Sequence, residues 1–241
     1  MRADVFLVEA GYAKSRSEAQ AAIRLGRVRA DGALLVKPSQ AIAADAIIDY
    51  EKPHPFVSRG GVKLAAALDR FGLSPEGCVC LDLGASTGGF TQVLLQRGAA
   101  RVYALDVGHG QMTESLAQDP RVVRRDGVNA RDLAGVDFSG PVSVITADLS
   151  FISLKLALPP ALSLARSGAW AVMLVKPQFE VGRRAIGKGG IVRDQAAREA
   201  AVAEIGEFVA AQPGWNLLGH IQSPIEGGDG NGEYLLAARK T

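Results

Sequence analysis

Apolar residues in this chain fall into strand-length runs and helical stripes that alternate from position 79 to the end. This alternation predicts a doubly wound parallel sheet with helices between its strands. Strands are expected at 79–82, 101–106, 122–125, 142–147, 169–175, 215–221 and 234–239. Helices are expected at 90–97, at 194–212 and within 56–70, where a loop leads into the helix. The last two strands predict a terminal hairpin.

The first fifty residues show a different pattern, with two short helical stretches followed by strand signals. Helices are expected over 2–9 and from about Ser15 to Gly26, and strands over 28–30, 33–36 and 47–50. Ser15 and Glu18 have the spacing of a capping box, and Asp31-Gly32 is a strong hairpin signal. The sequence therefore predicts a separate α+β module over 1–50, joined by a proline-containing linker at 51–57 to a domain over 58–241.

The composition is that of a globular protein. The 241 residues are 48% apolar, enough for one large domain with a small appendage. The longest apolar runs are strand-length, and charged residues interrupt the first turns where a signal peptide would need an apolar core. We therefore expect a cytoplasmic protein with no membrane partner. We expect no metal site, since Cys78 and Cys80 lack metal-type partners nearby, and a monomer is plausible.

Basic residues are concentrated in the N-terminal module, although the net charge of the chain is only +2. Between positions 14 and 29 the module carries a single acid, Glu18, and five basic residues: Lys14, Arg16, Arg24, Arg27 and Arg29. A solvated helix face is one explanation. The segment also resembles the small RNA-binding domain of ribosomal protein S-four, through Gly11-Tyr12, the run K-S-R-S-E-A at 14–19, Ile23, Gly26-Arg27-Val28 and Asp31-Gly32. This resemblance implies that the five basic residues bind phosphates and 2′-hydroxyls of structured RNA.

The stretch at 79–90 reads V-C-L-D-L-G-A-S-T-G-G-F, a strand followed by a glycine-bearing turn and a helix start. Such a turn lets a ligand approach the backbone and offers it free N–H groups. The dinucleotide fingerprint G-x-G-x-x-G fails here at its second glycine. The stretch resembles motif I of S-adenosylmethionine-dependent methyltransferases; an ordinary strand-to-helix turn is the alternative. The resemblance implies cofactor contacts at Asp82, which could accept from an ammonium group, and at Gly84, Ala85, Ser86, Thr87, Gly88, Gly89 and Phe90.

Further candidates lie at the carboxyl ends of the later strands, where open α/β sheets bind their ligands. Asp106 follows the glycine turn by about 20 residues, the place where an acid binds ribose hydroxyls, and Val107 comes next. By resemblance, Asp126 and Asn129 would lie at the adenine edge. Asp148 ends the fourth strand and is a further cofactor candidate.

Four charged residues make the resemblance more specific. Lys63, Asp148, Lys176 and Glu233 match, in chain order, the Lys-Asp-Lys-Glu tetrad of FtsJ-like ribose 2′-O-methyltransferases. Supporting stretches are S-R-G-G-x-K-L at 58–64, D-V-G-H-G-Q at 106–111, A-D-L-S-F-I-S-L at 147–154 and K-P-Q-F-E-V-G at 176–182. With its RNA-binding module, the whole chain resembles the TlyA family, often labelled haemolysins but including ribosomal RNA 2′-O-methyltransferases.

The resemblance implies a Rossmann-like α/β fold with a seven-stranded, mostly parallel sheet, and S-adenosylmethionine as cofactor. The implied reaction is methyl transfer to a ribose 2′-hydroxyl of a cytidine in ribosomal RNA, free or in ribosomal subunits. Lys176 would act as general base, Asp148 and Glu233 would orient the lysines and the hydroxyl, and Lys63 would stabilise the site.

RNA contacts are also expected outside the N-terminal module, at Arg59 and in the glycine-rich segment 182–193 through Arg183, Arg184 and Lys188. This segment is expected to close on RNA, and a plain connection is the alternative. Two other functions remain open. A membrane-lytic protein would need a spanning or strongly amphipathic helix, and the sequence shows neither. An RNA-binding protein with a non-catalytic pocket would not need all four tetrad positions filled.

Overall fold

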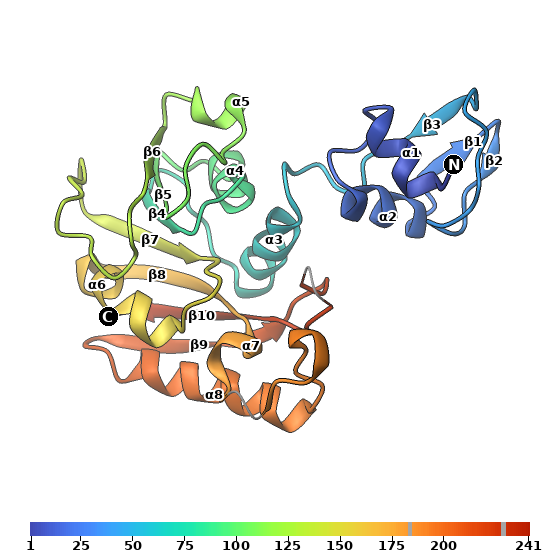
Figure 1. Cartoon of the computed structure of the whole chain (residues 1–241). Helices are drawn as coiled ribbons and strands as arrows, with labels where there is room; N and C mark the ends of the chain where they lie inside the picture. Colours follow the sequence, from blue (N-terminus) through green and yellow to red (C-terminus); the bar gives the residue numbers. More distant parts are fainter. Residues whose placement is uncertain (183–184, 228–229) are drawn as a thin grey trace. The chain divides into compact units, whose positions relative to one another are not determined.

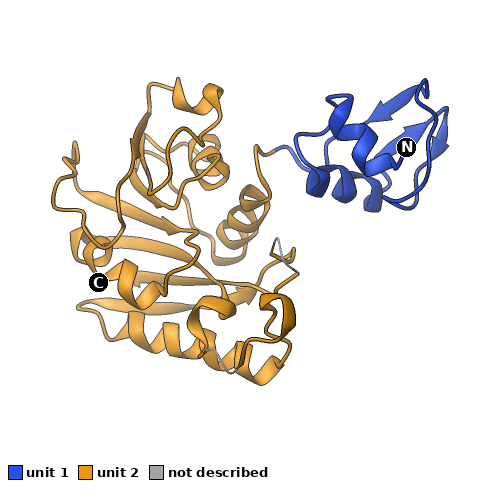
Figure 2. Cartoon of the chain, viewed as in Figure 1, with its two compact units in different colours: residues 1–55 blue, residues 56–241 orange. Residues whose placement is uncertain are grey.

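The computed structural model describes residues 1–182, 185–227 and 230–241. The chain divides into two compact units, Met1–Pro55 and Phe56–Thr241 (Figure 2). The boundary between these two units falls within the predicted linker at 51–57.

The N-terminal unit contains two helices and a small antiparallel sheet with the strand order β2-β1-β3. The elements are α1 (Ala3–Glu9), α2 (Arg16–Arg24), β1 (Val28–Ala30), β2 (Ala33–Leu34) and β3 (Ile48–Tyr50). Ser15 caps α2, because its side chain accepts a hydrogen bond from the Glu18 N–H. Asp31 and Gly32 both have positive φ angles, 51° and 78°, as a tight hairpin turn requires. Both helices and the hairpin are therefore confirmed.

The C-terminal unit is built on a seven-stranded sheet with the order β6-β5-β4-β7-β8-β10-β9 (Figure 1). The strands are β4 (Val79–Leu83), β5 (Arg101–Asp106), β6 (Val122–Asp126), β7 (Val142–Ala147), β8 (Ala165–Val175), β9 (Trp215–Gln222) and β10 (Tyr234–Lys240). The first five strands are parallel, and β10 pairs antiparallel with both β8 and β9. The predicted mostly parallel sheet and its terminal hairpin are confirmed.

Successive residues of each strand point to opposite sides of this sheet, so both of its faces carry apolar side chains. Helices cover both faces. The helices of the unit are α3 (Arg59–Phe71), α4 (Gly89–Gln96), α5 (Glu114–Ala117), α6 (Leu154–Leu164), α7 (Pro177–Glu180) and α8 (Gln195–Ala210). Leu64 of α3 and Leu94 of α4 pack with Cys80 of β4 on one face. Leu158 of α6 and Ile205 of α8 pack with Leu81 on the other. The result is a three-layer α/β/α domain whose parallel strands all end at one edge.

The short helix α7 was not predicted from the sequence. It follows β8 directly, with Pro177 in its first turn. Its last residue, Glu180, accepts hydrogen bonds from the Ser153 hydroxyl (2.6 Å) and the Leu154 N–H (2.9 Å) at the start of α6. Burial raises the pKa of this carboxyl, while the two hydrogen bonds oppose the shift. Glu180 therefore ties the end of α7 to the loop that follows β7.

Candidate active site

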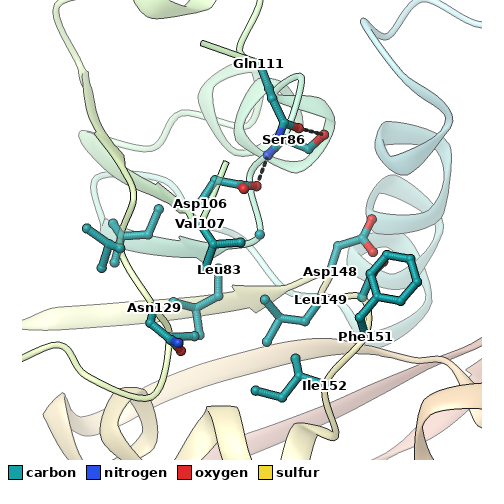
Figure 3. A pocket seen from close by; sticks show the side chains of 15 residues that line it. Leu83, Ser86, Asp106, Val107, Gln111, Asn129, Asp148, Leu149, Phe151 and Ile152 are labelled. Atoms are coloured by element: carbon teal, nitrogen blue, oxygen red, sulfur yellow. Dashed lines mark hydrogen bonds between the residues drawn. The ribbon is translucent and has the colours of Figure 1, made fainter. Parts of the chain in front are cut away.

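A cavity of about 450 Å³ opens at the carboxyl ends of β4, β5 and β7 (Figure 3). Its walls come from the glycine turn after β4, from the loops after β5 and β6, and from the loop after β7. The lining residues are Leu83, Gly84, Ser86, Leu105, Asp106, Val107, Gln111, Val128, Asn129, Ala130, Asp148, Leu149, Ser150, Phe151 and Ile152. Its volume and its mainly apolar walls with a few polar groups are typical of a small-molecule site.

A second, smaller cavity of about 120 Å³ shares Gly84, Ser86 and Asp148 with the first. Its other lining residues are Ser58, Gly60, Ala85, Thr87, Gly89 and Phe90. Because the two cavities have three lining residues in common, a single elongated ligand can reach both. The glycine turn and the start of α3 surround the smaller end of this combined site.

Gly84 brings the glycine turn against the loop after β7. Its φ angle is +77°, and a Cβ built on it would lie closer than 3.0 Å to the carbonyl oxygen of Asp148. The Asp148 N–H in turn donates to the Leu83 carbonyl at 2.9 Å. Only glycine allows both the backbone angle and this approach. The position of Asp148 therefore depends on the turn.

Asp106 is held by two backbone donors at the wall of the larger cavity. One carboxylate oxygen accepts from the Ser86 N–H at 2.8 Å, and the other accepts from the Gly108 N–H at 2.7 Å. Each oxygen keeps acceptor capacity for a further donor, such as a ribose hydroxyl. Val107 and Asn129 also line the cavity. The structure thus brings three of the predicted cofactor residues together.

Asp82 is buried beneath the turn and lines neither cavity. Its two carboxylate oxygens accept hydrogen bonds from the hydroxyls of Thr91 (2.6 Å) and Thr146 (2.8 Å). Burial raises the pKa of Asp82 to about 6, although the two hydroxyls lower it. The Asp82 side chain thus connects β4, α4 and β7 beneath the turn, and its expected contact with the cofactor stays a prediction.

Two further predicted cofactor residues lie behind the cavity walls. Asp126 accepts a hydrogen bond from the Gly110 N–H at 2.8 Å and so supports the loop after β5. Gly88 precedes α4 with a φ angle of +98° and packs against Leu116. Neither residue lines one of the two cavities, and their expected ligand contacts stay predictions. Both shape loops whose other residues line the site.

The four tetrad candidates form two ion pairs. Lys63 of α3 pairs with Glu233, and both side chains are buried. Lys176 pairs with Asp148, the nearest nitrogen and oxygen lying 2.6 Å apart, and the Lys176 side chain is only 12% exposed. Lys176 also donates to the Ser150 hydroxyl at 2.8 Å. Each buried or half-buried charge therefore has a partner of opposite sign.

Both pairs lie at the same edge of the sheet. Tyr234 of β10 pairs with Val175 of β8, so Glu233 and Lys176, each one residue outside the ladder, lie at the same level of neighbouring strands. Gly60 of α3 lies close to the Asp148–Lys176 pair, because a Cβ at that position would be 3.6 Å from Asp148 Oδ2. Lys63 follows Gly60 by one helical turn. Two lysine side chains and two carboxylates thus lie at the edge of the sheet where the larger cavity opens, an arrangement suited to proton transfer.

Comparison with known proteins shows the family of this chain. A family model described as FtsJ-like methyltransferase matches residues 56–240, and one described as S4 domain matches residues 1–48. The chain is 46% identical to the 16S/23S rRNA (cytidine-2′-O)-methyltransferase TlyA of Mycobacterium tuberculosis, over 99% of this chain and 89% of that protein. The chain belongs to the TlyA family of FtsJ-like methyltransferases.

Solved structures agree with this membership. A protein from Streptococcus thermophilus described as a haemolysin has a TM-score of 0.78 and 40% identity, covering 100% of this chain and 88% of that one. An O-methyltransferase from Bacillus cereus in complex with SAH has a TM-score of 0.52 at 19% identity, covering 76% of this chain and 82% of that one. The second likeness is one of fold alone. The TlyA-family chain therefore has the methyltransferase fold, and its larger cavity lies at the carboxyl ends of the parallel strands.

Sequence reasoning missed several residues of the TlyA-family site. Ser58 and Gly60 line the smaller cavity, and Ser150 and Phe151 line the larger one. Phe151 has a positive φ angle of 64° and a ring that is 91% exposed, 5.2 Å from the ring of Phe179 between centroids. A signal was present for all four, since they fall in the stretches 58–64 and 147–154 that carry the family resemblance.

The predicted RNA-binding residues lie in both units. In the N-terminal unit, Lys14, Arg16, Arg24 and Arg29 are exposed and Arg27 is half-buried. In the methyltransferase unit, Lys188 is exposed in a 3₁₀ turn and Arg59 is half-buried at the start of α3. Arg183 and Arg184 lie outside the described residues.

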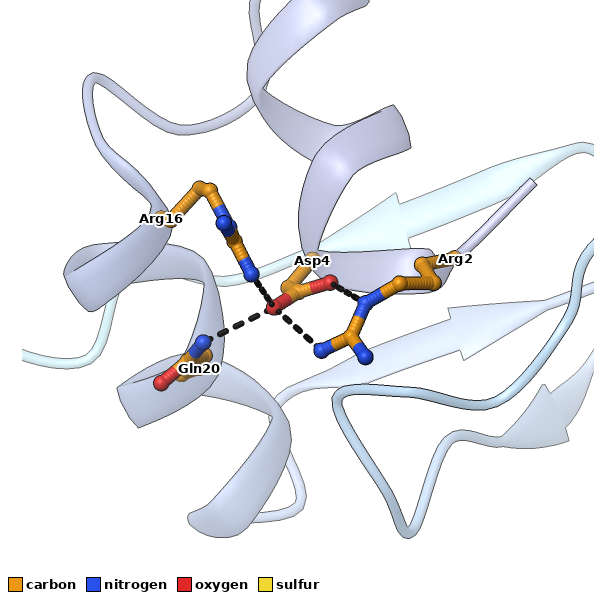
Figure 4. A network of polar contacts seen from close by, with 4 residues as sticks. All are labelled: Arg2, Asp4, Arg16 and Gln20. Carbon is orange, nitrogen blue, oxygen red and sulfur yellow. Dashed lines mark hydrogen bonds and ion pairs between the residues drawn. The ribbon is translucent and has the colours of Figure 1, made fainter.

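Buried Asp4 organises part of the basic surface of the N-terminal unit (Figure 4). Its carboxylate accepts hydrogen bonds from Arg2 (two of 3.0 Å), Arg16 (3.1 Å) and Gln20 (2.8 Å). The Arg2 guanidinium, through its hydrogen bond and charge, holds the pKa of Asp4 far below its usual range. Arg2, which sequence reasoning missed, is thereby fixed beside Arg16, and both side chains stay at least half exposed.

The described residues contain neither a membrane-spanning helix nor a group of metal ligands. None of the helices in this part of the chain is both long and apolar enough to cross a membrane. Within the same residues, no three His, Cys, Asp or Glu side chains are grouped as a metal site would need.

Proposed function

We propose that this chain transfers a methyl group from S-adenosylmethionine to the ribose 2′-hydroxyl of a cytidine in ribosomal RNA. The observation that carries the proposal is the placement of the two ion pairs, Lys63 with Glu233 and Asp148 with Lys176, at one edge of the sheet. Family membership and the name of the M. tuberculosis relative support the same reaction.

The cavity residues suit the proposed cofactor. The Asp106 carboxylate, fixed by two backbone N–H groups, would accept hydrogen bonds from the ribose hydroxyls. Val107 and Asn129 would lie along the adenine, and Gly84 leaves room for the backbone of the turn to approach the methionine end. When bound, S-adenosylmethionine supplies an electrophilic methyl group on a sulfonium centre. Asp148 lines both cavities, so the reacting end would lie next to the Asp148–Lys176 pair.

The tetrad would then control the proton of the attacking hydroxyl. As the ribose oxygen takes the methyl group, its hydroxyl proton would pass to Lys176 Nζ, which must be in its neutral amine form to accept it. Asp148 holds this nitrogen in place. Lys63, itself held by Glu233, adds positive charge that stabilises the developing oxyanion. Correct positioning alone can contribute about 7–11 kcal/mol to such a step.

The N-terminal unit would bind the RNA that carries the target nucleotide. Arg2 and Arg16, held side by side by Asp4, offer guanidinium groups to phosphates, and Lys14, Arg24 and Arg29 extend this basic surface. In the methyltransferase unit, the exposed ring of Phe151 at the cavity offers a surface on which a base can stack. Ribosomal RNA, free or within subunits, is therefore the proposed partner, and the proposed location is the cytoplasm.

Label transfer tests this function. The protein is incubated with methyl-labelled S-adenosylmethionine and either ribosomal subunits or free ribosomal RNA. We expect label in the RNA with the wild type and none with Lys176→Ala, while cofactor affinity stays close to wild type in both. Lys155→Ala is the matched control, because Lys155 pairs with Glu204 on α8 and should keep full transfer. Transfer that persists in Lys176→Ala would refute the assigned base.

The same experiment separates the two alternative functions. An RNA-binding protein with a non-catalytic pocket would bind cofactor and RNA without transferring label. A membrane-lytic protein would release dye from loaded liposomes, so a leakage assay is run on the same preparation. We expect transfer without leakage.

A further inference from the structure

The loop after β7 gives Lys176 a second contact besides the Asp148 carboxylate, through Ser150. Five consecutive residues of this loop, 148–152, line the larger cavity. The loop is anchored at its start by the Asp148 N–H, which donates to the Leu83 carbonyl, and after Ser150 by Ser153, whose hydroxyl donates to Glu180. Ser150 therefore lies between two fixed points, on the stretch that faces the site.

Two acceptors from this loop contact the Lys176 amine. Asp148 Oδ1 lies 2.6 Å from Nζ, and the Ser150 hydroxyl oxygen accepts from Nζ at 2.8 Å. The Ser150 hydroxyl accepts a hydrogen bond from the amine, whereas Asp148 Oδ1 is in ion-pair contact with it and forms no hydrogen bond. Because an ion pair is less directional than a hydrogen bond, the Ser150 hydroxyl gives the amine its orientation toward a substrate hydroxyl. With Asp148 alone, the flexible lysine side chain could rotate about a single contact.

We propose that Ser150 is a positioning residue for methyl transfer, which fixes the Lys176 amine at the cavity wall together with Asp148. The inference rests on the proposed function, in which Lys176 takes the proton of the ribose hydroxyl. Ser150 acts through Lys176 and not on the cofactor, so its loss should change turnover without changing ligand affinity. Misplacement of a general base by about 1 Å is enough to lower a rate substantially.

Two substitutions at this position test the proposal. Ser150→Ala removes the acceptor, and we expect kcat to fall about tenfold, the effect of one lost hydrogen bond at a charged group. The KM values for cofactor and RNA and the Tm should stay close to wild type. Ser150→Thr keeps the hydroxyl, and since Ser150 is exposed its extra methyl group has room, so this variant should recover most of the turnover.

Ser153→Ala is the matched control. Ser153 lies in the same loop, but its hydroxyl donates to Glu180 and accepts from the Lys155 N–H, so it has no contact with Lys176. We expect this variant to lose stability, because the loop loses one anchor, and to lose much less kcat than Ser150→Ala, because the contact with Lys176 remains. If Ser150→Ala keeps full kcat, or if its loss equals that of Ser153→Ala and accompanies a lower Tm, the positioning role is wrong.

A second readout does not depend on catalysis. Competitive acylation followed by mass spectrometry measures the reactivity of each lysine amine, with exposed Lys188 as the internal reference. Release of Nζ from Ser150 should raise the labelling of Lys176 severalfold in Ser150→Ala and leave Lys188 unchanged. If the wild type transfers no methyl group, the proposed function fails, yet this labelling still decides the role of Ser150. Unchanged Lys176 labelling would overturn it.

Discussion

Replacement of Gly84 by alanine probes the contact that places Asp148 beside the active site. The added Cβ meets two obstacles, a backbone φ angle of +77° and the carbonyl oxygen of Asp148 at less than 3.0 Å. The backbone strain should cost about 1–2 kcal/mol, and the overpacking a further 1–3 kcal/mol. Because the obstructing atom is backbone, relief requires movement of the segment that holds Lys176.

Gly72→Ala is the matched control for this substitution. Gly72 ends α3 with a φ angle of +62°, and a Cβ there meets nothing within 4 Å. Denaturant unfolding should show a loss of about 1–2 kcal/mol for Gly72→Ala and about 2–5 kcal/mol for Gly84→Ala. Calorimetry and turnover should show weakened cofactor binding and a kcat reduced on the order of 100-fold for Gly84→Ala alone. Equal stability losses with normal turnover in both variants would refute the reasoning.

Three further predictions concern buried polar groups. Burial raises the pKa of Asp82 from 3.8 to about 6. The protonated carboxyl therefore stabilises the fold at low pH, and this contribution to the free energy of unfolding is lost as the pH rises through 6, by on the order of 3 kcal/mol between pH 4 and 7. Asp82→Asn should remove this pH dependence from denaturant titrations. Asn231→Ala leaves the Val192 N–H without its acceptor and should cost about 1–3 kcal/mol, with faster amide exchange at Val192; unchanged exchange would contradict this. Lys63→Met should destabilise the protein by about 3–5 kcal/mol, because Glu233 stays buried and unpaired. Adding Glu233→Gln should restore stability but not turnover. A double variant as unstable as the single one would argue against this explanation.

Much of the fold could be predicted from the chain because its signals are local. The apolar run at 79–82, the glycine turn and the helix start lie within a dozen neighbouring residues. The period of the apolar residues separates strands from helices without any knowledge of distant contacts. The capping serine of α2 and the Asp31-Gly32 turn are similarly local. Such features set the order and type of the elements.

The pairing within the site could not be predicted, because it depends on tertiary packing. Lys63 and Glu233 are 170 positions apart, and the sequence does not show that they pair with each other. Their meeting depends on the packing of α3 beside β10, the strand that Glu233 precedes. Residue types at strand ends indicate which groups are available, and helix packing decides which of them touch.

The orientation of the Asp82 side chain could not be predicted from the sequence either. Its position in the motif indicates a ligand contact, yet hydroxyls from α4 and β7 occupy both of its oxygens below the turn. Sequence alone does not reveal which side of the turn a carboxylate faces when its partners come from other elements. The pattern points to the turn beside which the two cavities lie, and the structure separates the residues that line these cavities from those that support the turn.

The chemical identity of the product tests the central claim most directly. Ribosomal RNA treated with the protein and S-adenosylmethionine is digested to nucleosides and analysed by mass spectrometry against authentic standards. The account predicts 2′-O-methylcytidine from the wild type and its absence from Lys176→Ala. A cytidine methylated on its base, or no methylated nucleoside from any form of the RNA, would contradict it.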